Sequence, residues 1–376
     1  VTGRPARSKS SGRGGRSPFS VDPVSLQIHP IDPTNDGALS GWYDAYLAAD
    51  THGRDHAIPW QYAEFAAALR LPPTTDWRQA WVAVAPHTAG SDGADGQAVG
   101  AGLVEFPLTD NLDLAWIQTF VPPTERGAGV GSALLAAMEQ VAIEGNRHIL
   151  ASEASYRFGG EPEEGPDVAW AVARGYRVGQ VSVQRRLRLA EGYADRLAEL
   201  GAQAAAYHGD YTLVGWSGTA PEELLPGLAA LSATLTVEAP AGELLIEAGS
   251  SDPAAFRHHE QTLAAQGRTR HTTVALDTAG EVVAYSDLIS SLHTPELAYQ
   301  WGTLVRPADR GHRLGLAVKA ANLQRLLAQV PSVREVTTHN AGENAAMVAV
   351  NDALGFVPVE GLAELQKLVP GAADPR

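Results

Sequence analysis

The sequence contains no cysteine and only three lysines, and it has no long hydrophobic run. Without cysteine the chain forms neither a disulfide nor a thiolate nucleophile. This absence is compatible with a reducing cytoplasm, where we expect the protein to reside. No apolar run approaches the roughly 18 residues that span a bilayer, so we expect no membrane partner.

Basic residues are too few to balance the acidic ones: 28 Lys and Arg face 43 Asp and Glu, a formal net charge of −15. General binding of nucleic acid needs a basic face, so we expect no nucleic-acid partner. An acidic surface favours the approach of a cationic amine, although the same charge also serves solubility. Residues 1–21 depart from this balance because they combine five basic residues with many Ser and Gly. We predict that they form a disordered basic tail.

A metal site is the one function that the histidines suggest. His52, Asp55 and His56 lie within five residues of each other, but no further clustered ligand follows them. A zinc site needs three or four protein ligands. We therefore expect a polar loop here and no bound metal.

A glycine-rich turn occupies residues 121–133, Val-Pro-Pro-Thr-Glu-Arg-Gly-Ala-Gly-Val-Gly-Ser-Ala. It follows a strand-like run, residues 112–120, and precedes a helical pattern with Leu134, Leu135 and Met138 on one face. A strand, a glycine turn and a helix start place free backbone N–H groups at the positive end of a helix. Such a turn suits phosphate or pyrophosphate.

The same pattern returns 184 residues later, in residues 305–317, with Val, Pro, Arg, Gly, Gly and Ala at matching positions. This copy also follows a strand-like run, residues 297–304, and precedes a helical pattern. A repeat of this length indicates a duplicated domain and not a solenoid unit.

Val-x-Pro-x-x-Arg-Gly-x-Gly-x-Gly after a strand resembles the acetyl-CoA signature of the GNAT N-acyltransferase superfamily. The second copy continues through Asn340, Asn351 and Leu354-Gly355-Phe356, which resemble the next strand and helix of that superfamily. The resemblance covers nearly all of the chain beyond about residue 22. Its tandem layout is similar to that of mycothiol synthase. It implies an α/β fold of two GNAT-like domains, each a mixed, largely antiparallel sheet flanked by helices.

We therefore predict a first domain over residues 22–190, a helical connecting segment over 191–209 and a second domain over 210–376. Residues 90–96 are expected to form a hairpin loop. Residues 177–189 are expected to close the sheet of the first domain, and residues 357–368 that of the second.

The resemblance also implies a cofactor, acetyl-CoA or another short acyl-CoA, and the residues that hold it. In the first domain these are Phe120, Val121, Arg126, Gly127, Gly129, Gly131 and Ser132. In the second they are Leu304, Val305, Arg310, Gly311, Arg313, Gly315, Leu316 and Asn340. The copies differ from the family pattern in opposite ways. The first lacks an equivalent of Asn340, and the second carries Arg313 where the first has Gly129.

The proton acceptor is less defined than the cofactor site. Both domains lack the tyrosine that often serves as general acid in this superfamily, since Ala171 and Asn351 stand at its place. Acidic and polar side chains on or beside the central strands are the candidates: Glu105, Asp113, Glu153, Asp287, His293, Glu296 and Tyr299. We favour Glu105, Asp287 and Tyr299 as catalytic groups, with Glu105 as the leading base.

The predicted function is transfer of an acetyl or short acyl group from CoA to the amine of a small molecule, by a monomer or homodimer. A mycothiol synthase-like acetyltransferase and a non-catalytic acyl-CoA-binding protein are the alternatives. A dinucleotide-binding oxidoreductase is disfavoured because no acidic residue ends a second strand about 20 residues after the turn.

Overall fold

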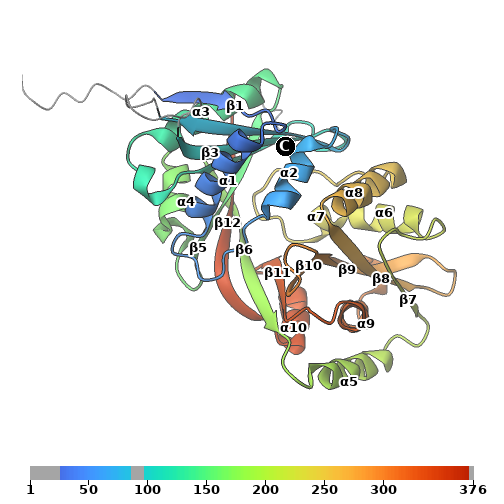
Figure 1. Cartoon of the computed structure of the whole chain (residues 1–376). Coiled ribbons are helices and arrows are strands. Elements are labelled where there is room, and N and C mark those ends of the chain that lie inside the picture. The colour runs from blue at the N-terminus through green and yellow to red at the C-terminus, as the bar shows by residue number, and fades with distance from the viewer. Residues whose placement is uncertain (1–25, 86–96, 372–376) are drawn as a thin grey trace, which may run out of the picture.

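A computed structural model describes residues 26–85 and 97–371 (Figure 1). The expected basic tail, residues 1–21, and the expected hairpin loop, residues 90–96, lie outside the described residues. Over the rest of the chain the predicted α/β class is confirmed. The described strands form one continuous twelve-stranded sheet with helices on its faces. We call residues 26–189 the first half and residues 190–371 the second half.

The first half contains six strands and four α-helices in the described residues. They are β1 (Gln27–Pro30), α1 (Asp36–Asp50), α2 (Tyr62–Arg70), β2 (Asp76–Val84), β3 (Ala98–Pro107), β4 (Leu114–Phe120), α3 (Val130–Glu144), β5 (Ile149–Arg157), α4 (Pro166–Val172) and β6 (Arg177–Arg188). Successive side chains of a strand point to opposite faces. Leu103 of β3 therefore packs under α1 and α2, while its neighbour Val104 packs under α3.

The second half repeats the plan with more helices. Its elements are α5 (Tyr193–Ala205), β7 (Thr212–Ser217), α6 (Leu225–Ala233), α7 (Leu235–Glu238), α8 (Pro253–Ala265), β8 (Arg268–Leu276), β9 (Val282–Ser291), β10 (Leu297–Val305), α9 (Leu314–Gln329), β11 (Glu335–Ala341), α10 (Ala345–Leu354) and β12 (Val357–Leu368). The connecting segment is helical as predicted, because α5 lies within it. Whether residues 191–209 separate two domains stays a prediction.

The last strands of the two halves are exchanged. The strand order is β1-β2-β3-β4-β5-β12-β6-β11-β10-β9-β8-β7, so β12 lies between β5 and β6. In Figure 1, β12 (red) runs beside β6 (light green) between the two halves. β12 pairs with β5 from Glu360↔Arg157 to Leu368↔Ile149, and β6 pairs with β11 from Arg188↔Glu335 to Ser182↔Ala341.

The prediction that residues 177–189 and 357–368 each close the sheet of their own domain is therefore wrong. Both segments are strands, but each pairs with the fifth strand of the other half. Alternation of apolar and polar residues decides which face of a strand is buried, and it carries little information about which neighbour the strand pairs with.

Five ion pairs among the described residues also join the halves, and two of them lie close to the cavities described below. Arg54 contacts Glu360 of β12 at 2.8 Å, and Arg268 of β8 contacts Glu64 of α2 at 2.6 Å. Both pairs are largely shielded from solvent. Loss of Arg268 would leave the charge of Glu64 buried and uncompensated, whereas Arg54 also pairs with Asp50. Among the helices of the described ranges, none is long and apolar enough to cross a membrane.

Candidate active site

A cavity of about 1050 Å³ extends from the glycine turn of the first half to the strands that come from the second half. We call it the large cavity. One end is lined by the turn, with Arg126, Gly127 and Gly129. The other end is lined by side chains of the second half, including Tyr299 and Glu364. Because β12 is exchanged, both halves contribute walls to one space.

The turn itself is shaped by glycines with positive φ. Gly127 and Gly129 have φ values of 82° and 86°, and an added Cβ at either would meet no atom within 4 Å. Gly129 is the N-cap of α3, so the first N–H groups of this helix face the open space of the cavity. This geometry suits an anion with several oxygens.

Positive side chains surround the turn. Arg174 stacks on the ring of Trp170 at 3.9 Å and donates a 2.7 Å hydrogen bond to the hydroxyl of Ser132. Arg126 donates from Nε to the carbonyl oxygen of Val121 at 3.1 Å and lies 3.9 Å from Asp167. The sequence reasoning did not include Arg174, which lies just after α4, 42 residues beyond Ser132.

Two carboxylates face each other across β5 and β12 at the other end of the large cavity. Glu153 and Glu364 are direct cross-strand partners. The Nε2 of Gln118 donates to Glu153 at 3.3 Å, and the hydroxyl of Ser182 donates to Glu364 at 2.6 Å. Within residues 26–85 and 97–371, neither carboxylate has a Lys, Arg or His nitrogen within 4.0 Å.

The environment of Glu153 disfavours its charged form. Its side chain is exposed to the open cavity, but the surrounding walls reduce its contact with bulk water. Burial, followed by repulsion from Glu364, raises the pKa of Glu153 to about 7. A neighbouring Arg54 and the hydrogen bond from Gln118 act in the opposite direction. Glu153 can therefore both accept and release a proton near neutral pH.

Other polar groups of the large cavity are held in fixed states. Arg54 pairs with Asp50 at 2.6 Å as well as with Glu360. Burial raises the pKa of the Tyr299 hydroxyl, which stays protonated at neutral pH. Burial lowers the pKa of His339 to about 4, so its imidazole is neutral.

The turn of the second half has the same backbone course. Arg313 is the N-cap of α9 with φ 52°, the left-handed conformation that Gly129 adopts in the first half. Its guanidinium lies over the ring of Tyr207 at 4.1 Å. Arg310 repeats the hydrogen bond to the preceding carbonyl, that of Val305, at 3.3 Å, and it also pairs with Glu238 of α7 at 2.8 Å.

Side chains occupy the space beside Gly302, on the strand that leads to this turn. At Gly302 of β10, an added Cβ would lie 2.5 Å from the hydroxyl oxygen of Tyr285 and 3.1 Å from Leu235. Asn340 accepts a 3.0 Å hydrogen bond from Asn351, whose oxygen accepts one of 2.6 Å from Lys319. The remaining residues expected to hold cofactor here, Leu304, Gly311, Gly315 and Leu316, line neither the large cavity nor the smaller one described below.

The structure separates the three favoured catalytic residues. Tyr299 lines the large cavity. Glu105 lines a different, smaller cavity and is paired there with Arg78. Asp287 is buried, accepts a 2.6 Å hydrogen bond from Thr272 and lines neither of these two cavities.

Of the other candidates, only Glu153 lines the large cavity. Asp113 accepts a 2.6 Å hydrogen bond from His148, and His293 and Glu296 line neither cavity. Sequence reasoning missed Glu364 because its strand was expected in the other sheet. Among the described residues no group of three or more potential metal ligands is close enough to hold an ion.

The fold is similar to that of known structures, although no family model and no curated protein matches the sequence. A tandem GNAT protein from the clavulanic acid biosynthesis pathway superposes with a TM-score of 0.73 at 25% identity, and the match covers 93% of this chain and 99% of that one. This chain has the tandem GNAT fold.

Two further solved structures superpose on most of this chain. A GCN5-related N-acetyltransferase from Sphaerobacter thermophilus gives a TM-score of 0.62 at 15% identity, over 91% of this chain and 95% of that one. A glucosamine N-acetyltransferase region in a fungal multi-domain GH3 β-N-acetylglucosaminidase gives 0.59 at 16% identity, over 92% of this chain but 38% of that one. At such identities these two similarities describe the fold only.

Proposed function

We propose that this protein is a CoA-dependent N-acyltransferase acting on a small-molecule amine, with its reaction centre in the large cavity beside the turn of the first half. The observation that carries the proposal is the continuity of this cavity. It connects an anion-binding turn to a carboxylate, Glu153, whose pKa of about 7 suits a general base.

The residues around the turn fit acyl-CoA. Gly127 and Gly129 leave open space on the cavity side, and Arg126, Arg174 and Ser132 offer charge and hydrogen bonds to a diphosphate. The backbone of Phe120 and Val121 borders the path from the turn to Glu153. A bound acyl-CoA would supply the activated acyl group as a thioester.

The carboxylates of the large cavity would handle the amine. An amine reaches the protein mainly as an ammonium ion, which has no free electron pair for attack. Glu153 and Glu364 attract this cation, and Glu153 takes its proton, leaving the neutral amine as nucleophile. Tyr299, protonated at neutral pH, can act in the same space as a proton donor but not as a base.

The second half contributes wall residues to this reaction centre but not the cofactor turn. It supplies Glu364, Tyr299 and His339 to the walls, while Leu235 and Tyr285 fill the space beside Gly302, on the strand that leads to its own turn. We therefore assign cofactor binding to the first half and place Glu153, instead of Glu105, in the role of base. Glu105 is tied to Arg78 in the other cavity and would have to break that ion pair to accept a proton.

The proposal is tested by mixing the protein with acetyl-CoA and a panel of amines and measuring thiol release. We expect turnover with at least one amine, and a loss of about 10²- to 10⁴-fold for Glu153→Gln, the usual contribution of a general base. Affinity for CoA, measured by calorimetry, should not change. The matched control is Glu199→Gln on the exposed face of α5.

Two results would contradict the proposal. If the protein binds CoA but releases no thiol with any amine of the panel, it is a non-catalytic binding protein. Full turnover in Glu153→Gln together with loss in Glu105→Gln would move the reaction centre to the smaller cavity.

A further inference from the structure

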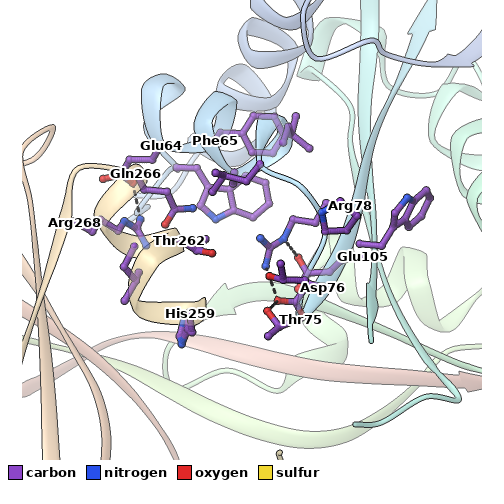
Figure 2. Close-up of a pocket in the computed structure, with 18 of the residues that line it drawn as sticks. Glu64, Phe65, Thr75, Asp76, Arg78, Glu105, His259, Thr262, Gln266 and Arg268 are labelled. Atoms are coloured by element: carbon purple, nitrogen blue, oxygen red, sulfur yellow. Dashed lines mark hydrogen bonds and ion pairs between the residues drawn. The ribbon is translucent and has the colours of Figure 1, made fainter. Parts of the chain in front are cut away.

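A second, smaller cavity of about 430 Å³ lies where α2 of the first half faces α8 of the second half. We call it the small cavity. In Figure 2, Glu64 and Phe65 approach it from α2, and His259 and Thr262 from α8. Its volume falls in the range of about 300 to 1,000 Å³ that is typical of small-molecule sites.

The small cavity adjoins the large one. Trp60, Arg268 and Trp301 line both cavities, so these three side chains form their common wall. The two cavities are therefore close enough for one elongated ligand to be considered for both.

The charged groups of the small cavity already have partners. Arg78 forms an ion pair with Glu105 and lies 3.5 Å from Asp76 (Figure 2). Arg268 is paired with Glu64. A charged ligand would have to displace one of these partners and leave it uncompensated, which is costly in a partly buried site. The ion pairs therefore favour an uncharged ligand.

The histidine that lines the small cavity, His259, is also uncharged. His259 stacks on the indole of Trp301, with ring centroids 5.8 Å apart and planes 8° apart. Burial and the nearby Arg270 lower the pKa of His259 to about 3, so its ring is neutral at physiological pH. The stacked pair thus presents a flat and neutral surface.

Most other lining side chains are apolar. They include two further tryptophans, a phenylalanine and three leucines: Trp60, Trp77, Phe65, Leu69, Leu71 and Leu103. Aromatic walls favour flat apolar groups, which gain from stacking as well as from removal from water.

We propose that the small cavity binds an uncharged aromatic or apolar tail of the acceptor, so that the substrate class is an amine with an extended hydrophobic group. This inference rests on the proposed function, because it places the reacting amine in the large cavity. The amine end faces the unpaired carboxylates Glu153 and Glu364, and the tail passes Trp60 and Trp301.

The probes are phenylalkylamines of increasing chain length and the corresponding alkylamines without the phenyl group. We expect the phenyl group to raise kcat/KM roughly ten- to hundredfold once the chain is long enough to reach the small cavity, as burial of one ring predicts. Without acetyl-CoA, the same long phenylalkylamines should change the intrinsic tryptophan fluorescence, since Trp60, Trp77 and Trp301 line the cavity.

Two variants fill the small cavity from opposite sides. Ala68 of α2 and Thr262 of α8 line this cavity and not the large one. Ala68→Trp and Thr262→Trp should each abolish the preference for the phenyl group and the fluorescence response, while turnover of short alkylamines is retained. Ala63→Trp, on the exposed face of α2, is the matched control and should keep the preference. Retained turnover of the short amine also shows that a variant is folded.

The outcomes separate this inference from the proposed function. If short amines are acylated but the phenyl group gives no preference, or if the preference survives in both filled variants, the inference is wrong and the proposed function stands. If no amine is acylated but long phenylalkylamines bind and binding is lost in both filled variants, the tail site is supported and the acyltransferase proposal fails.

Discussion

Replacing Glu364 with Gln should make Glu153 a stronger acid. The two carboxylates are direct cross-strand partners on β12 and β5, and repulsion from Glu364 is the second largest cause of the raised pKa of Glu153, after burial. The amide of Gln removes the negative charge and still offers an oxygen to the hydroxyl of Ser182. The perturbation therefore changes charge with little change of shape.

The size of the effect follows from the spacing of the strands. Side chains directly opposite each other have Cβ atoms about 5 Å apart. At an effective dielectric constant of about 20, two unit charges at this distance repel by about 3 kcal/mol. Water in the open cavity weakens this repulsion, so we expect the pKa of Glu153 to fall by roughly one to two units. Burial remains, and the pKa stays above that of a free glutamate.

The assay is the pH dependence of kcat/KM for a fixed amine at saturating acetyl-CoA. A base must be deprotonated to act, so the rate should rise with pH through the pKa of Glu153, about 7. In Glu364→Gln this rise should move to lower pH by the same one to two units, and in Glu153→Gln it should disappear. A rise that stays at the same pH in Glu364→Gln, with the fold intact, would refute the pairing of these two carboxylates.

Three further predictions concern the proposed cofactor turn, the buried Lys319 and the exchanged strand β12. Gly129→Trp should abolish CoA binding measured by calorimetry. Gly129→Ala has the same cost of about 1–2 kcal/mol for a left-handed backbone and should retain most of the binding. Equal binding by the two variants would show that the turn is not the cofactor site. Burial lowers the pKa of Lys319 from 10.5 to about 7, so the unfolded chain binds more protons between these pH values and the stability of the native protein should rise from pH 7 to 10.5. Lys319→Met should remove that rise and increase the free energy of unfolding at pH 7 by about 2–4 kcal/mol, and an unchanged urea midpoint at pH 7 would contradict it. Gly361→Leu should lower the melting temperature strongly, because its side chain would collide with the ring of Tyr156 on the paired strand β5; a melting temperature within a degree or two of the wild type would mean that the strands can separate locally.

The turns were predictable because their chemistry is local. A glycine at Gly129 marks a left-handed residue, and the apolar spacing after it marks the helix, so residues 121–133 and 305–317 were placed correctly between strand and helix. Arg126 and the turn glycines, which the sequence pattern proposes for cofactor binding, line the large cavity.

The acceptor end was not predictable in the same way. Glu105 and Glu153 both lie on central strands, and the sequence does not show which carboxylate has a cation opposite it. Arg78 faces Glu105 across β2 and β3, whereas Glu364 faces Glu153. The second contact joins residues more than 200 positions apart, and it depends on the strand exchange, which no local pattern specifies.

The exchange of strands has a consequence for synthesis on the ribosome. β5 ends at Arg157 and its neighbour β12 begins at Val357, two hundred residues later. Domains usually fold as their own residues emerge, but here the first sheet stays open along β5 until almost the whole chain has been made. During that interval the unpaired edge can accept the same strand from another copy of the chain. Fast translation at high concentration should therefore yield intertwined dimers, in which each large cavity is completed by a neighbouring molecule.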